Sequence, residues 1–228
     1  MGEREDSRVR ALLLVDIQKD FCEGGSLAVE GGNATVPVAN RLRREGSFEG
    51  RVFLTQDWHP DSHVSFASVS GKQPFSSISL KHPHQDDVEY QQTVWPDHCV
   101  QGSEGAEWHK DLVVEESDVV VSKGTDVGAD SYSGFFDNHQ ANQTELDSKL
   151  RAAGVTELCI VGIATDVCIH FTVMDAVEHC GYDVVVVKEG CAGIDPDASE
   201  KCIALWKSKG VTVVDDVDAY LSLKQINK

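Results

Sequence analysis

Basic residues are scarce in this chain. Its 228 residues include 20 Lys and Arg against 38 Asp and Glu, and the formal net charge is −18 at pH 7. Surfaces that bind nucleic acid or an anionic membrane need clustered Lys and Arg, so the charge argues against both kinds of partner. The acidity is typical of a solvated surface that repels other copies of itself.

Long apolar runs are also lacking. No run approaches the ~20 apolar residues that a membrane-spanning helix needs. Residues 1–8 hold no apolar core of the kind that a secretory signal contains. The seven cysteines are odd in number and form no Cys-x-x-Cys pair, which argues against a disulfide framework. We therefore expect a cytoplasmic protein in a reducing compartment.

Short, β-branched apolar runs recur along the chain with gaps of helix length. Continuous hydrophobicity is typical of strands that are buried on both faces of a parallel sheet. The expected strands are 11–15, 51–55, 118–122, 157–162, 183–187 and 211–214, and the expected helices are 36–44, 144–153, 166–180 and 196–206. The sequence therefore predicts an α/β fold, a doubly wound, mostly parallel six-stranded sheet with helices on both faces. We expect one domain over 1–228, with its core at about 10–220.

The stretch from 60 to 112 has no strong periodicity and is rich in Ser, His, Pro and Gln. A loop of this length inside a compact domain is usually functional or disordered. The sequence leaves its conformation open, above all between residues 68 and 92.

Chemically capable side chains follow four of the predicted strands. Asp16, Asp57 and Lys123 each stand where an apolar run stops, and Cys168 lies in the first turn of the helix after residues 157–162. In an open parallel sheet, ligands bind outside the carboxyl ends of the strands, so we expect these four side chains to converge on one crevice.

Cys168 is a candidate nucleophile. The positive end of the helix dipole and a neighbouring ammonium such as that of Lys123 would favour its thiolate. Asp16 could accept the thiol proton and later deliver it to a leaving amine. Each of these residues also has a structural alternative. Cys168 could be a buried cysteine of the core, Lys123 a solvated lysine of a loop, and Asp16 an aspartate that caps a helix or turn.

A metal site is predicted beside these groups. Residues i and i+2 of a strand point to the same side, so Asp57 and His59 can aim a carboxylate and an imidazole at one point, and His98 adds a second imidazole. This donor set suits a divalent ion such as Zn, Fe or Mn. The alternative is that Asp57 and His59 only cap a strand. His63 is either a fourth ligand or a hydrogen-bonded neighbour.

Several motifs, in order over about residues 10–215, resemble those of nicotinamidases, a branch of the isochorismatase-like cysteine hydrolases. They include VDIQKDF, QDWHP, WPDHCVQG and GIATDVC, and they lie at 15–29, 56–60, 63–67, 95–102, 123–125, 130–136 and 162–168. The Asp-x-His and Trp-Pro-x-His pair together marks the nicotinamidase branch.

The resemblance implies a role for each matching residue. It implies a catalytic triad of Asp16, Lys123 and Cys168, and one divalent metal, zinc first with iron or manganese as alternatives, on Asp57, His59 and His98. It also implies an oxyanion hole from the backbone N–H groups of Ala164 and Cys168, with a cis peptide between Ile163 and Ala164. Phe21 and Trp95 would sandwich the pyridine ring of the substrate, and Tyr132 would close the pocket.

The function that the resemblance implies is hydrolysis of nicotinamide to nicotinate and ammonia through a thioester, in NAD salvage. A related amidase could instead take pyrazinamide or a carbamoyl compound. A catalytically silent pyridine-binding sensor should lack a triad member, and all three are present. A dinucleotide-binding module is disfavoured because no G-x-G-x-x-G follows the first strand. The nicotinamide substrate is the only partner expected, and assembly into a homo-oligomer is left open.

Overall fold

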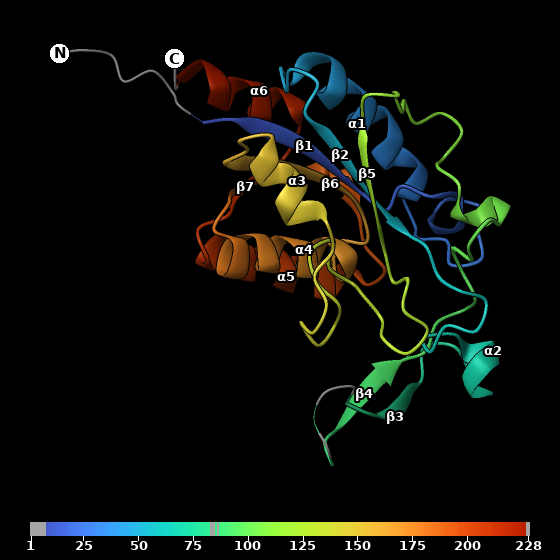
Figure 1. Ribbon diagram of the computed structural model, residues 1–228. Coiled ribbons are helices and arrows are strands. Elements are labelled where there is room, and N and C mark those ends of the chain that lie inside the picture. The colour runs from blue at the N-terminus through green and yellow to red at the C-terminus, as the bar shows by residue number, and fades with distance from the viewer. Residues whose placement is uncertain (1–7, 83–84, 86, 227–228) are drawn as a thin grey trace.

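Six parallel strands form the central sheet of the protein. The computed structural model describes residues 8–82, 85 and 87–226 (Figure 1). The sheet has the order β5-β2-β1-β6-β7-β8, and every neighbouring pair is parallel. Its strands are β1 (Arg10–Val15), β2 (Val52–Asp57), β5 (Val119–Lys123), β6 (Glu157–Ile163), β7 (Asp183–Ala192) and β8 (Thr212–Val214).

Helices cover both faces of this sheet. Successive residues of β1 point to opposite faces, so Leu13 and Val15 join one apolar core while Leu12 and Leu14 join the other. The first core is closed by α3 (Leu146–Ala152), α4 (Cys168–Asp175) and α5 (Pro196–Ser208), and the second by α1 (Gly32–Glu45) and α6 (Val217–Ile226) (Figure 1). The predicted fold class is thus confirmed.

Element boundaries differ from the predictions in a few places. The helix expected at 166–180 begins only at Cys168 and ends in a π-helical turn, η3 (Ala176–Cys180). Helix α1 begins at Gly32, before the expected residue 36, and β7 continues five residues past 187. Helix α6 (Val217–Ile226) was not among the predicted helices.

The stretch between residues 60 and 112 contains more structure than its sequence indicates. It holds the short helices α2 (Ala67–Ser70) and η2 (Glu104–Ala106), and η2 packs beside η1 (Lys19–Phe21). It also holds an antiparallel hairpin of β3 (Ser77–Lys81) and β4 (Glu89–Thr93), which projects from the body of the molecule (Figure 1). These two strands are mostly polar and exposed, so they lack the apolar run that marks a buried strand.

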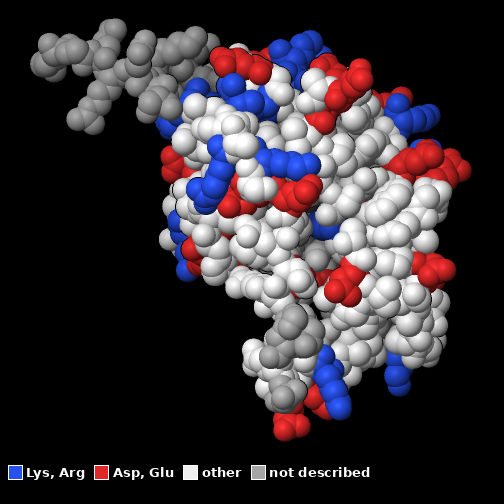
Figure 2. All heavy atoms as spheres, viewed as in Figure 1, with Lys and Arg blue, Asp and Glu red and all other residues white. Residues whose placement is uncertain are grey.

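The surface agrees with the acidic composition. On the face drawn in Figure 2, Lys and Arg side chains lie beside Asp and Glu rather than forming a continuous basic surface. Among the described helices, none combines the length and the apolar character needed to cross a bilayer.

Leu13 offers a test of the two-sided core. Its side chain is fully buried at the centre of the sheet, whereas Leu205 of α5 is 39% exposed. We expect Leu13→Ala to lower the free energy of unfolding by about 2–5 kcal/mol, because it removes buried methyl groups and leaves a cavity. Leu205→Ala, the matched control, should change it by less than about 1 kcal/mol. Urea unfolding followed by circular dichroism measures both; equal losses would contradict the assignment of Leu13 to the core.

Candidate active site

Four adjacent strands bring the predicted catalytic groups together. In the order β5, β2, β1 and β6, these strands end at or just before Lys123, Asp57, Asp16 and the loop that leads to Cys168. Lys123 pairs directly with Asp57 in the register of β5 and β2. Asp16 has a φ of 49°, in the left-handed region, and turns the chain out of the sheet directly after β1. The convergence predicted from the strand ends is present.

Lys123 lies at the centre of this group and is almost completely buried. Its Nζ atom is 3.0 Å from Oδ2 of Asp16, 2.5 Å from Oδ1 of Asp57 and 3.5 Å from Sγ of Cys168. It also donates a hydrogen bond of 2.9 Å to the backbone oxygen of Ser131. Burial by itself would lower the pKa of Lys123, but the two carboxylates hold that pKa well above its usual value. The side chain is therefore an ammonium.

The surroundings of Cys168 act on the pKa of its thiol in opposite directions. Burial raises the pKa of its thiol well above the ordinary value; Lys123 opposes this shift, and the carboxylates of Asp16 and Asp57 add to it. Burial and the two carboxylates thus act against the thiolate that the sequence predicts, while the ammonium of Lys123 favours it. Burial also raises the pKa of the Asp16 carboxyl, against the effect of Lys123, and makes Asp16 a better base. The site is thus arranged for proton transfer from Cys168 to Asp16.

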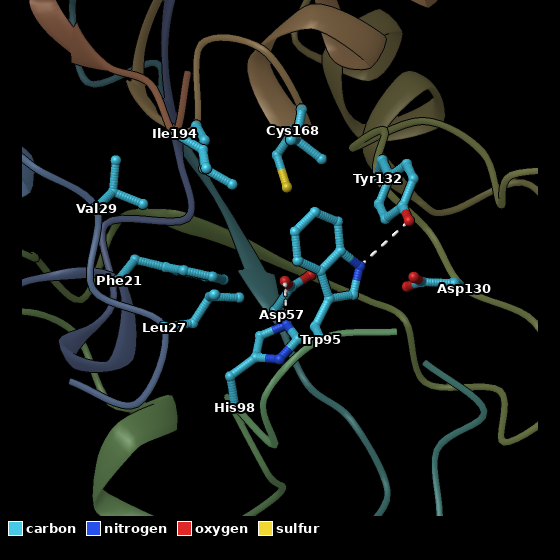
Figure 3. Close-up of a pocket in the computed structure, with 12 residues that line it drawn as sticks. Phe21, Leu27, Val29, Asp57, Trp95, His98, Asp130, Tyr132, Cys168 and Ile194 are labelled. Carbon is cyan, nitrogen blue, oxygen red and sulfur yellow. Dashed lines mark hydrogen bonds and ion pairs between the residues drawn. The ribbon is translucent and has the colours of Figure 1, made fainter. Parts of the chain in front are cut away.

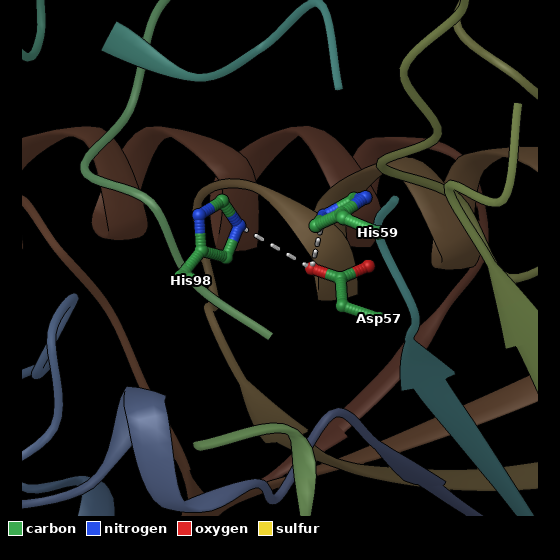
Figure 4. A group of neighbouring side chains, drawn as sticks. All are labelled: Asp57, His59 and His98. Carbon is green, nitrogen blue, oxygen red and sulfur yellow. Dashed lines mark ion pairs between the residues drawn. The ribbon is translucent and has the colours of Figure 1, made fainter. Parts of the chain in front are cut away.

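Asp57, His59 and His98 form a compact set of metal donors (Figure 4). Oδ2 of Asp57 is 3.5 Å from Nε2 of His59 and 3.8 Å from Nε2 of His98. Burial by itself would raise the pKa of the Asp57 carboxyl, but Lys123 and His59 hold it well below its usual range, so it is ionised. Three donor atoms within 4.8 Å of one another fit a single divalent ion.

Backbone carbonyls set the orientation of both imidazoles. Nδ1 of His59 is 2.8 Å from the oxygen of Gly124, and Nδ1 of His98 is 2.7 Å from the oxygen of Pro96. A carbonyl oxygen can only accept, so each Nδ1 carries the proton and each Nε2 keeps its lone pair for the ion. Gly124 has a φ of +62°, and a Cβ there would lie 2.3 Å from Cε1 of His59. This close approach requires glycine.

His63 and Asp130 lie behind the ring of His59. The rings of His59 and His63 stack with their centroids 4.2 Å apart. Nδ1 of His63 is 2.7 Å from Oγ of Ser65, and a ring nitrogen of His63 lies within 4.8 Å of donor atoms of His59 and Asp130. Burial lowers the pKa of His63 to about 4, so its imidazole is neutral. His63 thus lies against the ring of His59, outside the group of Asp57, His59 and His98.

The two N–H groups of the predicted oxyanion hole stand beside the thiol. The peptide bond between Ile163 and Ala164 is cis, as predicted. Among the described residues, the backbone N–H groups of Ala164 and Cys168 have no hydrogen-bond partner, whereas those of Val167 and Ile169 both donate to the oxygen of Ala164. Two unpaired donors next to Sγ can stabilise negative charge on an oxygen bound there.

A cavity opens onto these groups (Figure 3). Phe21, Trp95 and Tyr132, the three predicted substrate-binding residues, all line it, together with Asp57, His98 and Cys168. Sequence reasoning missed five further lining residues: Leu27, Val29, Asp130, Val167 and Ile194. Four of these are aliphatic and carry no chemical signature. Asp130 lies within a recognised motif, but its residue type alone gave it no role.

Comparison with known proteins identifies the family. The isochorismatase domain model matches residues 10–217. This chain belongs to the isochorismatase family. It is 46% identical over 207 residues to the nicotinamidase of Escherichia coli strain K12, with 90% of this chain and 93% of that protein covered.

Solved structures of nicotinamidases and a pyrazinamidase share the fold. Yeast nicotinamidase bound to the inhibitor nicotinaldehyde superposes with a TM-score of 0.85 at 29% identity, over 91% of this chain and 100% of that one. Pyrazinamidase of Pyrococcus horikoshii in complex with zinc gives a TM-score of 0.74 at 33% identity, over 91% of this chain and 99% of that one.

Removal of His98 tests the metal donor set. We expect His98→Ala to lose at least about tenfold in affinity for zinc, because one of three protein donors is gone. The control is His179→Ala, on η3, where the imidazole is half-exposed and far along the chain from the donors. Elemental analysis after dialysis against a weak chelator measures retained metal. Equal metal content in the two variants would exclude His98 as a ligand.

Proposed function

We propose that this protein is a metal-dependent nicotinamidase, in which Asp16, Lys123 and Cys168 hydrolyse the amide of nicotinamide. One observation carries the proposal: the two oxygens of Asp57 join the catalytic group to the metal donors. Oδ1 contacts Lys123, while Oδ2 faces His59 and His98. A ring nitrogen and a carboxamide on one small molecule can therefore meet the two halves of the site together.

The relatives support this substrate. The similar proteins of Escherichia coli and yeast are nicotinamidases. The yeast structure holds nicotinaldehyde, whose pyridine ring carries an aldehyde in place of the carboxamide of nicotinamide. In the present chain the cavity offers Phe21 and Trp95 for contact with such a flat ring and the thiol of Cys168 for its carbonyl carbon.

The mechanism follows from the protonation states. Asp16 takes the thiol proton as the sulfur of Cys168 attacks the amide carbon, and the nearby ammonium of Lys123 stabilises the negative charge. The N–H groups of Ala164 and Cys168 hold the oxyanion of the tetrahedral intermediate. Asp16 then gives its proton to the departing ammonia, which leaves a thioester. Water attacks the thioester with Asp16 as base, and nicotinate and the thiol are released.

We propose zinc as the ion that Asp57, His59 and His98 hold. Two imidazoles and a carboxylate suit zinc, and the similar pyrazinamidase was solved in complex with this metal. When bound, a divalent ion supplies Lewis acidity and a fixed anchor for a ring nitrogen. Its donors come from the end of β2, from the residues directly after that strand and from the loop that carries Trp95, so this loop contributes both to ring contact and to the metal set.

Replacement of the nucleophile tests the proposal. We expect Cys168→Ala to lower the rate of ammonia release from nicotinamide by at least about a thousandfold, because no thioester can form. Cys202→Ala, at a half-buried cysteine of α5 outside the site, should keep the activity of the unchanged protein. An ammonia assay over a panel of nicotinamide, pyrazinamide and a carbamoyl compound also ranks the substrates. Near-normal turnover of nicotinamide by Cys168→Ala would overturn the proposed mechanism.

A further inference from the structure

Gln92 is a buried polar residue on an otherwise exposed hairpin. In strands β3 and β4 the other side chains are exposed or half-buried, but Gln92 is only 2% exposed. It stands opposite Ile78 in the hairpin register, near the end of β4 that leads to Trp95. The body of the hairpin projects away from the parallel sheet (Figure 1).

The amide of Gln92 contacts two groups that line the cavity. Its Nε2 atom donates to Oδ2 of Asp130 at 2.8 Å and lies 3.2 Å from the hydroxyl oxygen of Tyr132. It is also 2.8 Å from the backbone oxygen of Thr93. A carboxylate accepts hydrogen bonds and cannot donate them, so the NH₂ end of the amide must face Asp130. The chemistry of the neighbours thus fixes how this side chain is turned.

Tyr132, in turn, contacts Trp95. Its hydroxyl oxygen accepts from Nε1 of Trp95 at 3.2 Å, and the two rings meet edge to face, with centroids 6.2 Å apart (Figure 3). The donors of Gln92 and Trp95 therefore converge on one oxygen. Because Trp95 and Tyr132 both line the cavity, a shift of that oxygen would shift one wall.

Asp130 is the second group that Gln92 fixes. Its carboxylate is nearly fully buried, and its other oxygen accepts from the backbone N–H of Ser131 at 2.8 Å. Without the amide of Gln92, Oδ2 would lose a charge-assisted hydrogen bond in a buried place, which is costly.

We propose that Gln92 is a positioning residue for substrate binding, holding Tyr132, Trp95 and Asp130 as one wall of the ring pocket. The proposal rests on the proposed nicotinamidase function. It makes the hairpin a part of the binding site although the hairpin lies outside the parallel sheet. Gln92 touches the wall and not Cys168, Asp16 or Lys123, so its loss should weaken binding of the ring more than it slows the chemical step.

The test is Gln92→Met, which keeps the length of the side chain and removes its donors. We expect KM for nicotinamide to rise about tenfold while kcat stays within about threefold, since the hydrogen bond to the Asp130 carboxylate and the longer contact with the Tyr132 hydroxyl are lost. The dissociation constant of nicotinate, measured by calorimetry, should rise by a similar factor. The matched control is Gln91→Met, one residue earlier on β4, where the side chain is exposed and contacts Ser77.

A second variant separates positioning from stability. Tyr132→Phe keeps the ring and removes the oxygen on which Gln92 and Trp95 converge, so it should also raise KM. In the double variant, Gln92→Met with Tyr132→Phe, the fold increase in KM should be smaller than the product of the fold increases in the two single variants. The reason is that both substitutions act through the hydroxyl oxygen of Tyr132. Additive effects, an unchanged KM in either single variant, or a fall in kcat with KM unchanged would each overturn the proposal. Should Gln92→Met fail to fold, the KM of Tyr132→Phe decides.

Failure of the proposed function is distinguishable from failure of this inference. If the unchanged protein releases no ammonia from nicotinamide, the nicotinamidase proposal fails. Calorimetry with nicotinate then still compares the unchanged protein with Gln92→Met. Equal affinities would show that Gln92 does not shape the pocket.

Discussion

The buried ammonium of Lys123 is the interaction on which the site depends. It compensates the carboxylates of Asp16 and Asp57 and approaches the sulfur of Cys168. Two carboxylates so close together in a buried place could not both stay ionised without a cation between them. Removal of one partner from such a buried group typically costs about 3–5 kcal/mol, because the remaining charge is left uncompensated. The same contact that stabilises the carboxyl ends of the strands therefore sets the chemistry.

Asp57 and Gly124 extend this control to the metal donors. Asp57 gives one oxygen to Lys123 and presents the other to the two histidines, so the ammonium and an ion held by the histidines would act on one carboxylate. The residue after Lys123, Gly124, accepts the Nδ1 proton of His59. The last residue of β5 thus supplies the central cation, and the residue after the strand orients His59. Catalytic and metal-binding geometry are consequently coupled through a few backbone positions.

Much of the fold and site could be predicted because the signals are local. A continuous apolar run marks a strand buried on both faces, and a polar residue at its end marks the rim where ligands bind, as at Asp16, Asp57 and Lys123. The hairpin β3–β4 gave no such signal, since its strands are polar and gain their order by pairing with each other. No local sequence feature distinguishes Gln92 from an exposed glutamine, or Ile194 from an ordinary aliphatic residue of a loop. Only the fold places both beside the cavity.

The sequence by itself determined which reactive groups are present and at which strand ends they stand, because residue type and hydrophobic pattern are written along the chain. It could not determine the protonation of Cys168. Only the tertiary structure decided which influences act on the pKa of its thiol, since that pKa depends on burial and on charges that β1, β2 and β5 bring together. The lining of the cavity also depends on the tertiary structure. Packing determines which aliphatic and aromatic side chains face the substrate ring, and no local sequence pattern indicates which ones they are.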